Sequence, residues 1–216
     1  ALVFLDPFGL KPLRFDALRP LLHRAGETDI FITFVTPAVA RHAAEHPEIV
    51  WDAIGSNDCP PVDPSAVLST FCRNLMSEGG FFGVSSYAIR SRKGQAPRYH
   101  LILASRSYHA FELMNDFVAQ EEAELDRRSY GAIAQQSFLK LWQDQEDQEE
   151  LINAIRAFGS RTNTTTREEI VQHIVLNHWA IWNTREVRKA VWGLIDVGEI
   201  ERTRVGRRGH IDSDPL

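Results

Sequence analysis

The sequence has little cysteine, no long hydrophobic run and no excess of positive charge. Its two cysteines, Cys59 and Cys72, show neither metal-site spacing nor a disulfide framework, so a reducing cytoplasm is the expected compartment. No apolar run is long enough to span a bilayer and no signal peptide is visible, so we expect no membrane partner. The net charge of -5 excludes a general coat of nucleic acid, although it permits a local basic patch.

Two common catalytic signatures are also missing. There is no phosphate-cradling glycine loop, and no serine stands in the context of a nucleophile elbow. The composition is that of an ordinary globular protein, 44% hydrophobic and 25% charged. A chain of 216 residues has room for one large domain, or for a medium domain and a small one.

The first ten residues combine a short apolar run with an abrupt break. Residues 1–5 (ALVFL) are too few for a stable helix and predict a strand buried on both faces, in a parallel sheet with helices above and below. Pro7 favours an extended residue before it, so Asp6 is expected at the carboxyl edge of the sheet, where open α/β sheets bind ligands. The alternative is an ordinary turn in which Asp6 caps a helix.

The following segments extend this strand into a mixed sheet. Helical spacing over 15–24 and a second apolar strand over 29–36 complete a βαβ unit with parallel strands. Strands over 81–90 and 99–105, joined by a basic turn, predict an antiparallel hairpin. Further helices are expected over 38–54 with a break at Pro47, over 64–76 and over 107–126. The predicted fold class is α/β, with parallel strands followed by an antiparallel hairpin.

A change of composition marks the domain organisation. Residues 126–149 are rich in acids and are typical of a solvated helical connector. We therefore predict an α/β domain over 1–125, this connector, and a small domain over 150–216.

The small domain has the layout of a winged helix, with three helices followed by a hairpin. The helices are expected over Leu151–Phe158, after a cap at Thr165 or Thr166, and from Asn183 or Thr184 to Gly198. Side chains suited to contacts with DNA or RNA lie on the third helix and on the hairpin: Thr184, Arg185, Arg188, Lys189, Arg202, Arg204, Arg207 and Arg208. A winged helix used only for protein contacts is the alternative.

The turn Asp6-Pro7-Phe8-Gly9 resembles the fourth motif of Rossmann-like S-adenosylmethionine-dependent methyltransferases, in which an acidic residue or Asn precedes Pro and an aromatic residue. With the runs 99–106 (YHLILASR) and 112–116 (ELMND), it is similar to the three-Cys-motif partner protein family over roughly residues 1–120. The resemblance implies a partial Rossmann-like methyltransferase sheet, S-adenosylmethionine as cofactor and a three-cysteine-motif protein as partner.

The same resemblance implies a role for each residue of the turn. Asp6 would lie near the transferable methyl group, where it holds or deprotonates the acceptor and is the one candidate for cofactor contact. Pro7 keeps the turn rigid, Phe8 would stack on a substrate ring, and Gly9 would keep the backbone clear.

Two features of that methyltransferase fold are not found in this chain. They are the glycine-rich turn after the first strand and the ribose-binding acid after the second. Residues 1–5 correspond to what would be the fourth strand, so we expect an N-terminal remainder of the fold to complete the cofactor pocket. The sequence thus predicts a methyltransferase-like protein acting on a nucleic-acid or related acceptor. The alternative is a non-catalytic winged-helix protein that binds DNA or protein on a degenerate α/β scaffold.

Two further signals have ordinary explanations. His42-Ala43-Ala44-Glu45-His46 matches the H-x-x-E-H pattern of inverted zinc proteases, but Pro47 follows at once and no third ligand is evident. We therefore predict the end of a surface helix there and no metal. The basic residues Arg90, Arg92, Lys93 and Arg98 at the predicted hairpin either face a substrate or belong to a solvated turn.

Overall fold

The computed structural model describes residues 1–7, 9–55, 63–90, 95–130, 137–162 and 164–201. The chain forms two compact units, Ala1–Phe111 and Glu112–Leu216, and each is described by itself. The composition predicts a boundary at residue 125. In the structure the division falls one turn into a long helix, which therefore belongs mostly to the second unit.

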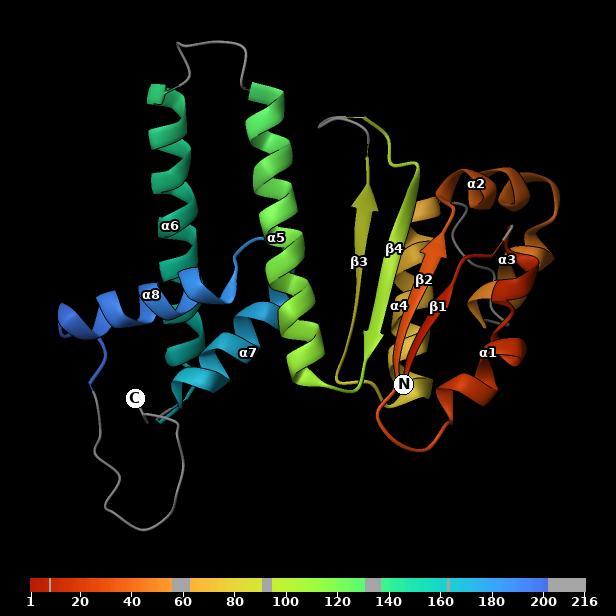
Figure 1. Cartoon of the computed structure of the whole chain (residues 1–216), viewed down its shortest axis with the longest axis horizontal. Coiled ribbons are helices and arrows are strands. Elements are labelled where there is room, and N and C mark those ends of the chain that lie inside the picture. The colour runs from red at the N-terminus through yellow and green to blue at the C-terminus, as the bar shows by residue number, and fades with distance from the viewer. Residues whose placement is uncertain (8, 56–62, 91–94, 131–136, 163, 202–216) are drawn as a thin grey trace. The chain divides into compact units, whose positions relative to one another are not determined.

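The first unit is built on four strands (Figure 1). They are β1 (Leu2–Leu5), β2 (Asp29–Phe34), β3 (Gly83–Ile89) and β4 (Tyr99–Ser105). Its helices are α1 (Phe15–Leu22), α2 (Thr36–Glu45), α3 (Pro47–Ile54) and α4 (Pro64–Gly79), with a short 3₁₀ helix η1 (Lys11–Leu13). The first turn of α5 (Tyr108–Tyr130) ends the unit.

The strands form one mixed sheet in the order β1-β2-β4-β3. β1 and β2 are parallel, whereas β4 is antiparallel to both β2 and β3. The predicted α/β class, the parallel pair and the antiparallel hairpin are confirmed. This topology places the carboxyl ends of β1, β2 and β3 at one edge of the sheet, together with the first residues of β4.

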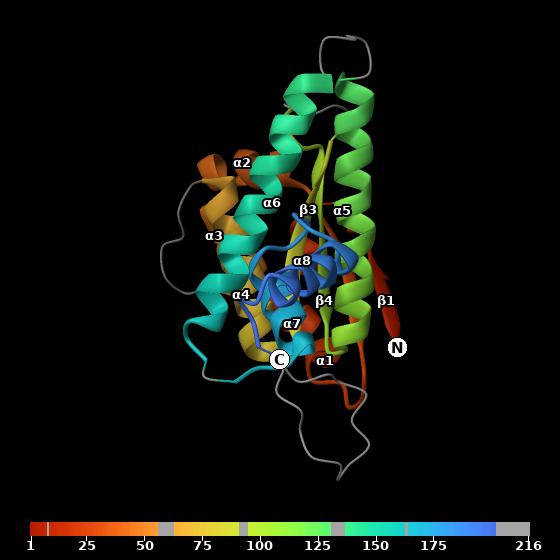
Figure 2. The same ribbon diagram turned by 90° about the vertical axis from the view of Figure 1, so that its left-hand side faces the viewer.

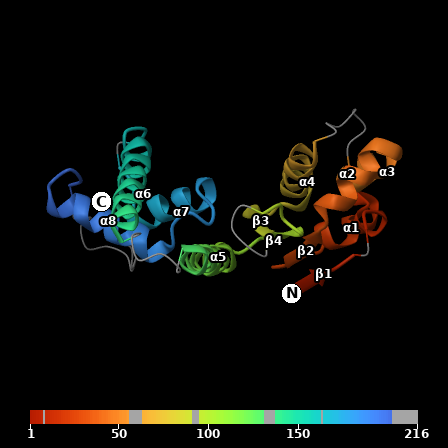
Figure 3. The ribbon, with the colours of Figure 1, turned by 90° about the horizontal axis from the view of Figure 1, so that it is seen from above.

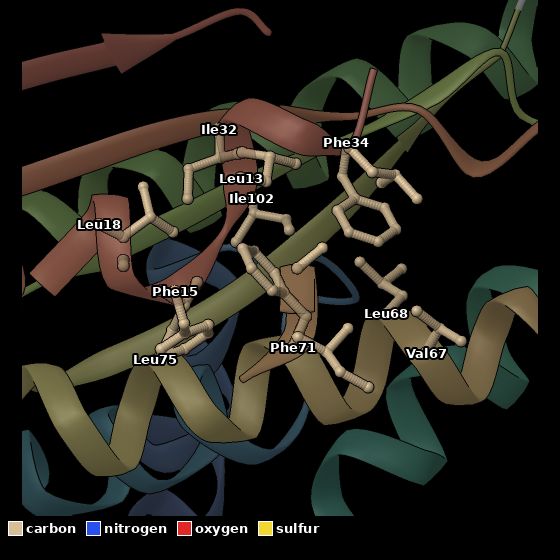
Figure 4. Packing of buried hydrophobic residues seen from close by; sticks show 14 of the residues in the cluster. Leu13, Phe15, Leu18, Ile32, Phe34, Val67, Leu68, Phe71, Leu75 and Ile102 are labelled. Carbon is tan, nitrogen blue, oxygen red and sulfur yellow. The ribbon is translucent and has the colours of Figure 1, made fainter. Parts of the chain in front are cut away.

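One face of the sheet packs against α1, α2, α3 and α4, which all lie on the same side of it (Figure 3). Ile30, Ile32 and Phe34 alternate along β2 and point into this core, as period-2 strands require. Phe71 of α4 lies at its centre (Figure 4), with ring centroids 5.8 Å from Phe15 and 5.4 Å from Phe34. Such aromatic pairs add to the stabilisation from burial alone.

The prediction that β1 is buried on both faces is wrong. Leu2 is 69% exposed and Phe4 is 62% exposed, and both alternate with the half-buried Val3 and Leu5. The physical reason is that β1 is at the end of the strand order, where only its inward face meets the helix layer. A short apolar run shows that a segment is a strand, but it does not show how many layers cover it.

At the opposite edge from the ends of β1 and β2, Arg106 joins two helices to the sheet. This residue follows β4 directly, and its guanidinium donates to the carbonyls of Leu22 and Arg24 at the end of α1 and of Gly26. It also donates to the carbonyl of Gly79, the last residue of α4, at 2.9 and 3.1 Å. The terminal carbonyls of a helix have no partners within the helix and carry its negative dipole end, so a cation is well suited to bind them.

The second unit is helical in the part of the chain that the structure describes. Beyond α5 it contains α6 (Ser137–Gly159), α7 (Arg167–Asn177) and α8 (Thr184–Asp196), and Figure 2 shows α7 and α8 beside α6. The predicted caps are confirmed, because Thr166 and Asn183 each form a capping box with a glutamate three residues later. The predicted helix over 151–158 begins earlier, since α6 also includes much of the acidic connector. The predicted hairpin lies outside the described residues.

Two polar residues of α5 hold the connection between α7 and α8. Asn115 is fully buried, donates to the Trp182 carbonyl at 2.9 Å and accepts from the Ala180 N–H at 2.8 Å. Asp116 accepts from the N–H and hydroxyl of Thr184. A buried amide with both of its ends paired fixes one arrangement of the groups around it.

No helix among the described residues is both long enough and apolar enough to cross a membrane.

We predict that Arg106→Lys destabilises the first unit by about 2–3 kcal/mol. Lysine keeps the positive charge but does not have the planar fork, so some of the four carbonyls are left without a donor. Urea denaturation measures the change. Arg19→Lys is the matched control, since Arg19 makes only surface ion pairs with Asp16 and Glu78 and its replacement is expected to cost under about 0.5 kcal/mol. Equal stability of the two variants would contradict the assigned role of Arg106.

Candidate functional site

A pocket of about 610 Å³ lies at the edge of the sheet where β1 and β2 end. Its walls come from β1, the turn after it, β2, α2 and the start of β4, and the lining residues are Phe4, Asp6, Pro7, Gly9, Thr33, Val35, Ala38, Arg41, His42 and Tyr99. The volume is within the range of pockets that bind small ligands. Of the predicted motif, Asp6, Pro7 and Gly9 line this pocket, and Phe8 lies outside the described residues.

The turn that carries Asp6 is fixed by the residues that follow it. Gly9 has a φ of +95°, a conformation that side-chain-bearing residues rarely adopt, and its N–H donates to the Pro7 carbonyl at 3.0 Å. Leu10 and Leu13 then enter the core, where they are 2% and 1% exposed. The chain is thus anchored immediately after the turn, which holds Asp6 at the mouth of the pocket.

The pocket brings together groups of opposite charge. Asp6 supplies the one carboxylate among the described lining residues, while Arg41 and His42 of α2 supply a guanidinium and an imidazole. Among the described residues, neither the Asp6 carboxylate nor the Arg41 guanidinium forms an ion pair or a side-chain hydrogen bond. Both side chains are exposed, so water hydrates them and a ligand is able to reach them.

The remaining walls of the pocket are mostly apolar. Phe4, Pro7 and Tyr99 present ring surfaces, and the Tyr99 phenol and the buried Thr33 hydroxyl add hydrogen-bonding groups. A pocket of this composition suits a planar ligand with a few polar substituents.

A hydrogen bond beside the pocket joins α2 to β4. The Thr36 hydroxyl, at the first residue of α2, lies 2.7 Å from Nδ1 of His100. Partial burial, and then the positive charge of Arg90, lower the pKa of His100 below its ordinary value. The imidazole is therefore neutral at pH 7, where Nδ1 is able to accept the hydroxyl proton.

The two histidines of the H-x-x-E-H pattern have separate environments. His42 lines the pocket from α2, whereas His46 follows the end of that helix and pairs with Glu48 at 3.3 Å. No group of three His, Cys, Asp or Glu side chains in the described part of the chain is arranged to hold a metal ion.

The predicted nucleic-acid residues of α8 divide into two pairs. Thr184 is 3% exposed and is bound to Asp116, and Arg188 pairs with Glu112 at 2.8 Å and Glu168 at 3.5 Å. These two side chains stabilise the second unit itself. Arg185 and Lys189 are exposed and available to a partner. The predicted hairpin arginines, Arg202, Arg204, Arg207 and Arg208, lie outside the described residues.

Sequence reasoning missed the residues of α2 and β4 that line the pocket. Arg41 stands next to His42 within a weakly amphipathic helix, and Tyr99 begins a strand far along the chain. Their proximity to Asp6 depends on the order of the strands. An available signal was the placement of both segments at the same edge of the sheet as Asp6.

No protein-family model, curated protein or solved structure matches this chain.

The described residues do not by themselves fit S-adenosylmethionine. The turns after β1 and β2 contain proline, at Pro7 and Pro37, instead of the glycine-rich run that lets a backbone approach this cofactor. No carboxylate follows β2 directly, and Asp6 is the one carboxylate among the described residues that line the pocket.

We expect the titration of His100 to make the first unit less stable in acid. Because the folded protein binds this proton more weakly than the unfolded chain, stability is full above the unfolded pKa of about 6.5 and declines as the pH falls through the folded pKa. His100→Gln removes the titration and keeps an acceptor for Thr36. Urea denaturation at about pH 7 and about pH 5 is expected to show a smaller loss for this variant than for the wild type.

His23→Gln is the control, because His23 is an exposed histidine of the same unit. Its pH dependence is expected to equal that of the wild type. If His100→Gln also keeps the wild-type pH dependence, the low pKa of His100 is not a source of acid sensitivity.

Proposed function

We propose that the Asp6 pocket is the acceptor-binding part of a methyl-transfer site, and that the acceptor is an amine of a nucleic acid or a related compound. The observation that carries the proposal is the unpaired Asp6 carboxylate, exposed in a pocket at the carboxyl edge of the parallel pair β1 and β2. Open α/β sheets bind ligands at this edge. The resemblance of Asp6-Pro7-Phe8-Gly9 to a methyltransferase motif supports the reaction class.

The chemistry assigned to this chain concerns the acceptor alone. A carboxylate oxygen of Asp6 accepts a hydrogen bond from an N–H of the acceptor amine, which orients the nitrogen lone pair and stabilises the positive charge that develops as the nitrogen forms a new bond. The ring surfaces of Phe4, Pro7 and Tyr99 hold the planar base. S-adenosylmethionine would be the methyl donor. The described residues would supply the part of the site that binds the methyl acceptor.

We predict that Asp6→Asn lowers methyl transfer by about 100-fold or more, because an amide is a weaker acceptor and takes up no proton. The measurement is transfer of labelled methyl from S-adenosylmethionine to single-stranded and duplex DNA and RNA by the protein. Asp16→Asn, at an exposed aspartate of α1, is the matched control and is expected to be fully active. Equal transfer by the wild type and Asp6→Asn, with no binding of S-adenosylmethionine by calorimetry, would refute the methyl-transfer proposal.

A second candidate function rests on the second unit. Helices α6, α7 and α8 pack together, and α8 exposes Arg185 and Lys189 four residues apart on one face. This arrangement supports the proposal of a winged helix that binds the phosphates of DNA through α8.

For this function we predict that the double variant Arg185→Gln/Lys189→Gln binds duplex DNA more weakly. The slope of log K against log salt is expected to become shallower by about 2, one unit for each phosphate that the variant no longer neutralises. The control Arg73→Gln/Arg161→Gln removes the same charge from exposed positions elsewhere and is expected to keep the wild-type slope. An unchanged slope in the Arg185/Lys189 variant would exclude α8 as the DNA-binding helix.

A further inference from the structure

Arg41 is one of several arginines of the first unit, with Arg24, Arg90 and Arg98, that have no ion pair or side-chain hydrogen bond among the described residues. Of these four arginines, it is the one that lines the Asp6 pocket. Arg14 pairs with Asp52, Arg19 pairs with Asp16 and Glu78, and Arg106 binds backbone carbonyls. Arg41 has no such partner among the described residues, and it lines the pocket that contains Asp6. A guanidinium in a ligand pocket without an internal partner is available to an anion.

The wall that carries Arg41 offers a further donor to an anion. His42 lies beside Arg41 on the same pocket wall, and both stand in the second half of α2, beyond its first turn. The positive charge of this wall is therefore that of the Arg41 guanidinium, and the His42 imidazole adds an N–H donor.

Asp6 restricts where such an anion is able to bind. The carboxylate repels a negative group on the wall formed by the turn after β1, whereas α2 attracts one. A ligand that satisfies both walls must carry a hydrogen-bond donor at one end and an anion at the other. The flat surfaces of Phe4, Pro7 and Tyr99 lie in the same pocket and suit an aromatic ring.

We propose that Arg41, assisted by His42, is a phosphate subsite of this pocket, and that the ligand is a nucleotide whose base carries an exocyclic amine. The inference rests on the proposed function, since it takes the Asp6 end of the pocket as the amine-binding end. Arg41 forms charge-assisted hydrogen bonds with the phosphate in the planar, forked geometry that guanidinium and phosphate share. Asp6 accepts from the amine of the same nucleotide.

The test is a set of binding measurements by calorimetry at constant ionic strength. The probes are adenosine and cytidine, their 5′-monophosphates, and inorganic phosphate. The wild type is expected to bind each monophosphate about 10-fold or more tightly than its nucleoside, the value of one charge-assisted hydrogen bond. Arg41→Gln is expected to abolish this difference between monophosphate and nucleoside. Arg41→Lys is expected to recover part of the difference in affinity, because lysine keeps the positive charge but does not have the planar, forked guanidinium.

Two control variants complete the design. Arg73→Gln removes an exposed arginine of α4 and is expected to bind every probe like the wild type. Asp6→Asn is expected to weaken nucleoside binding, because the amine loses its acceptor, and not to weaken inorganic phosphate, because the repelling charge is removed.

The outcomes separate the two proposals. Equal affinity for nucleosides and monophosphates in the wild type, with binding that depends on Asp6, would overturn the phosphate subsite and leave the proposed function standing. Phosphate binding that depends on Arg41, without any nucleoside binding that depends on Asp6, would refute the acceptor assignment instead.

Discussion

The Arg106 guanidinium is the interaction on which the first unit most depends. It binds four backbone carbonyls, three in and just after the last turn of α1 and one at the end of α4, and its charge lies 5.4 Å from the centre of the Phe81 ring. The carbonyls at two helix ends would otherwise meet with their negative dipole ends together. A single planar cation relieves this repulsion and joins both helices to β4.

The polar groups at the two ends of β4 differ in whether they are bound within the chain. β4 runs from Tyr99, in the pocket, to Ser105, next to Arg106, a distance of about 20 Å. At the Arg106 end, polar groups are paired within the chain, including Ser105 with Asp29 at 2.5 Å. At the pocket end, Asp6 and Arg41 have no partner among the described residues. One edge of the sheet thus stabilises the fold and the other is open to a ligand.

Local patterns predicted the elements well, because their signals lie within a few residues. The strand over 29–36, the break at Pro47 and the caps at Thr166 and Asn183 were all deducible from the residues next to them. The apolar run that ends before Pro7 was sufficient to place Asp6 at a sheet edge. Features that depend on contacts between residues far apart in the sequence could not be predicted in this way. The exposure of Phe4 depends on the position of β1 at the end of the strand order. The hydrogen bond that occupies the Thr184 hydroxyl depends on Asp116 of another helix. The pocket partner Arg41 has no sequence signature, since helix α2 becomes a wall of the site only after the sheet has formed.

The selectivity proposed for the pocket follows from the hydration of its two charged side chains, Asp6 and Arg41. Asp6 and Arg41 are exposed, so keeping them apart costs the folded protein little while water surrounds them. A ligand that enters must displace some of this water, and each charge left without a partner then reduces affinity. A neutral planar ligand would leave both the Asp6 carboxylate and the Arg41 guanidinium without a partner, and a simple anion would pair only with Arg41. A ligand with an amine at one end and a phosphate at the other compensates both, which is the physical basis for expecting a nucleotide at this edge of the sheet.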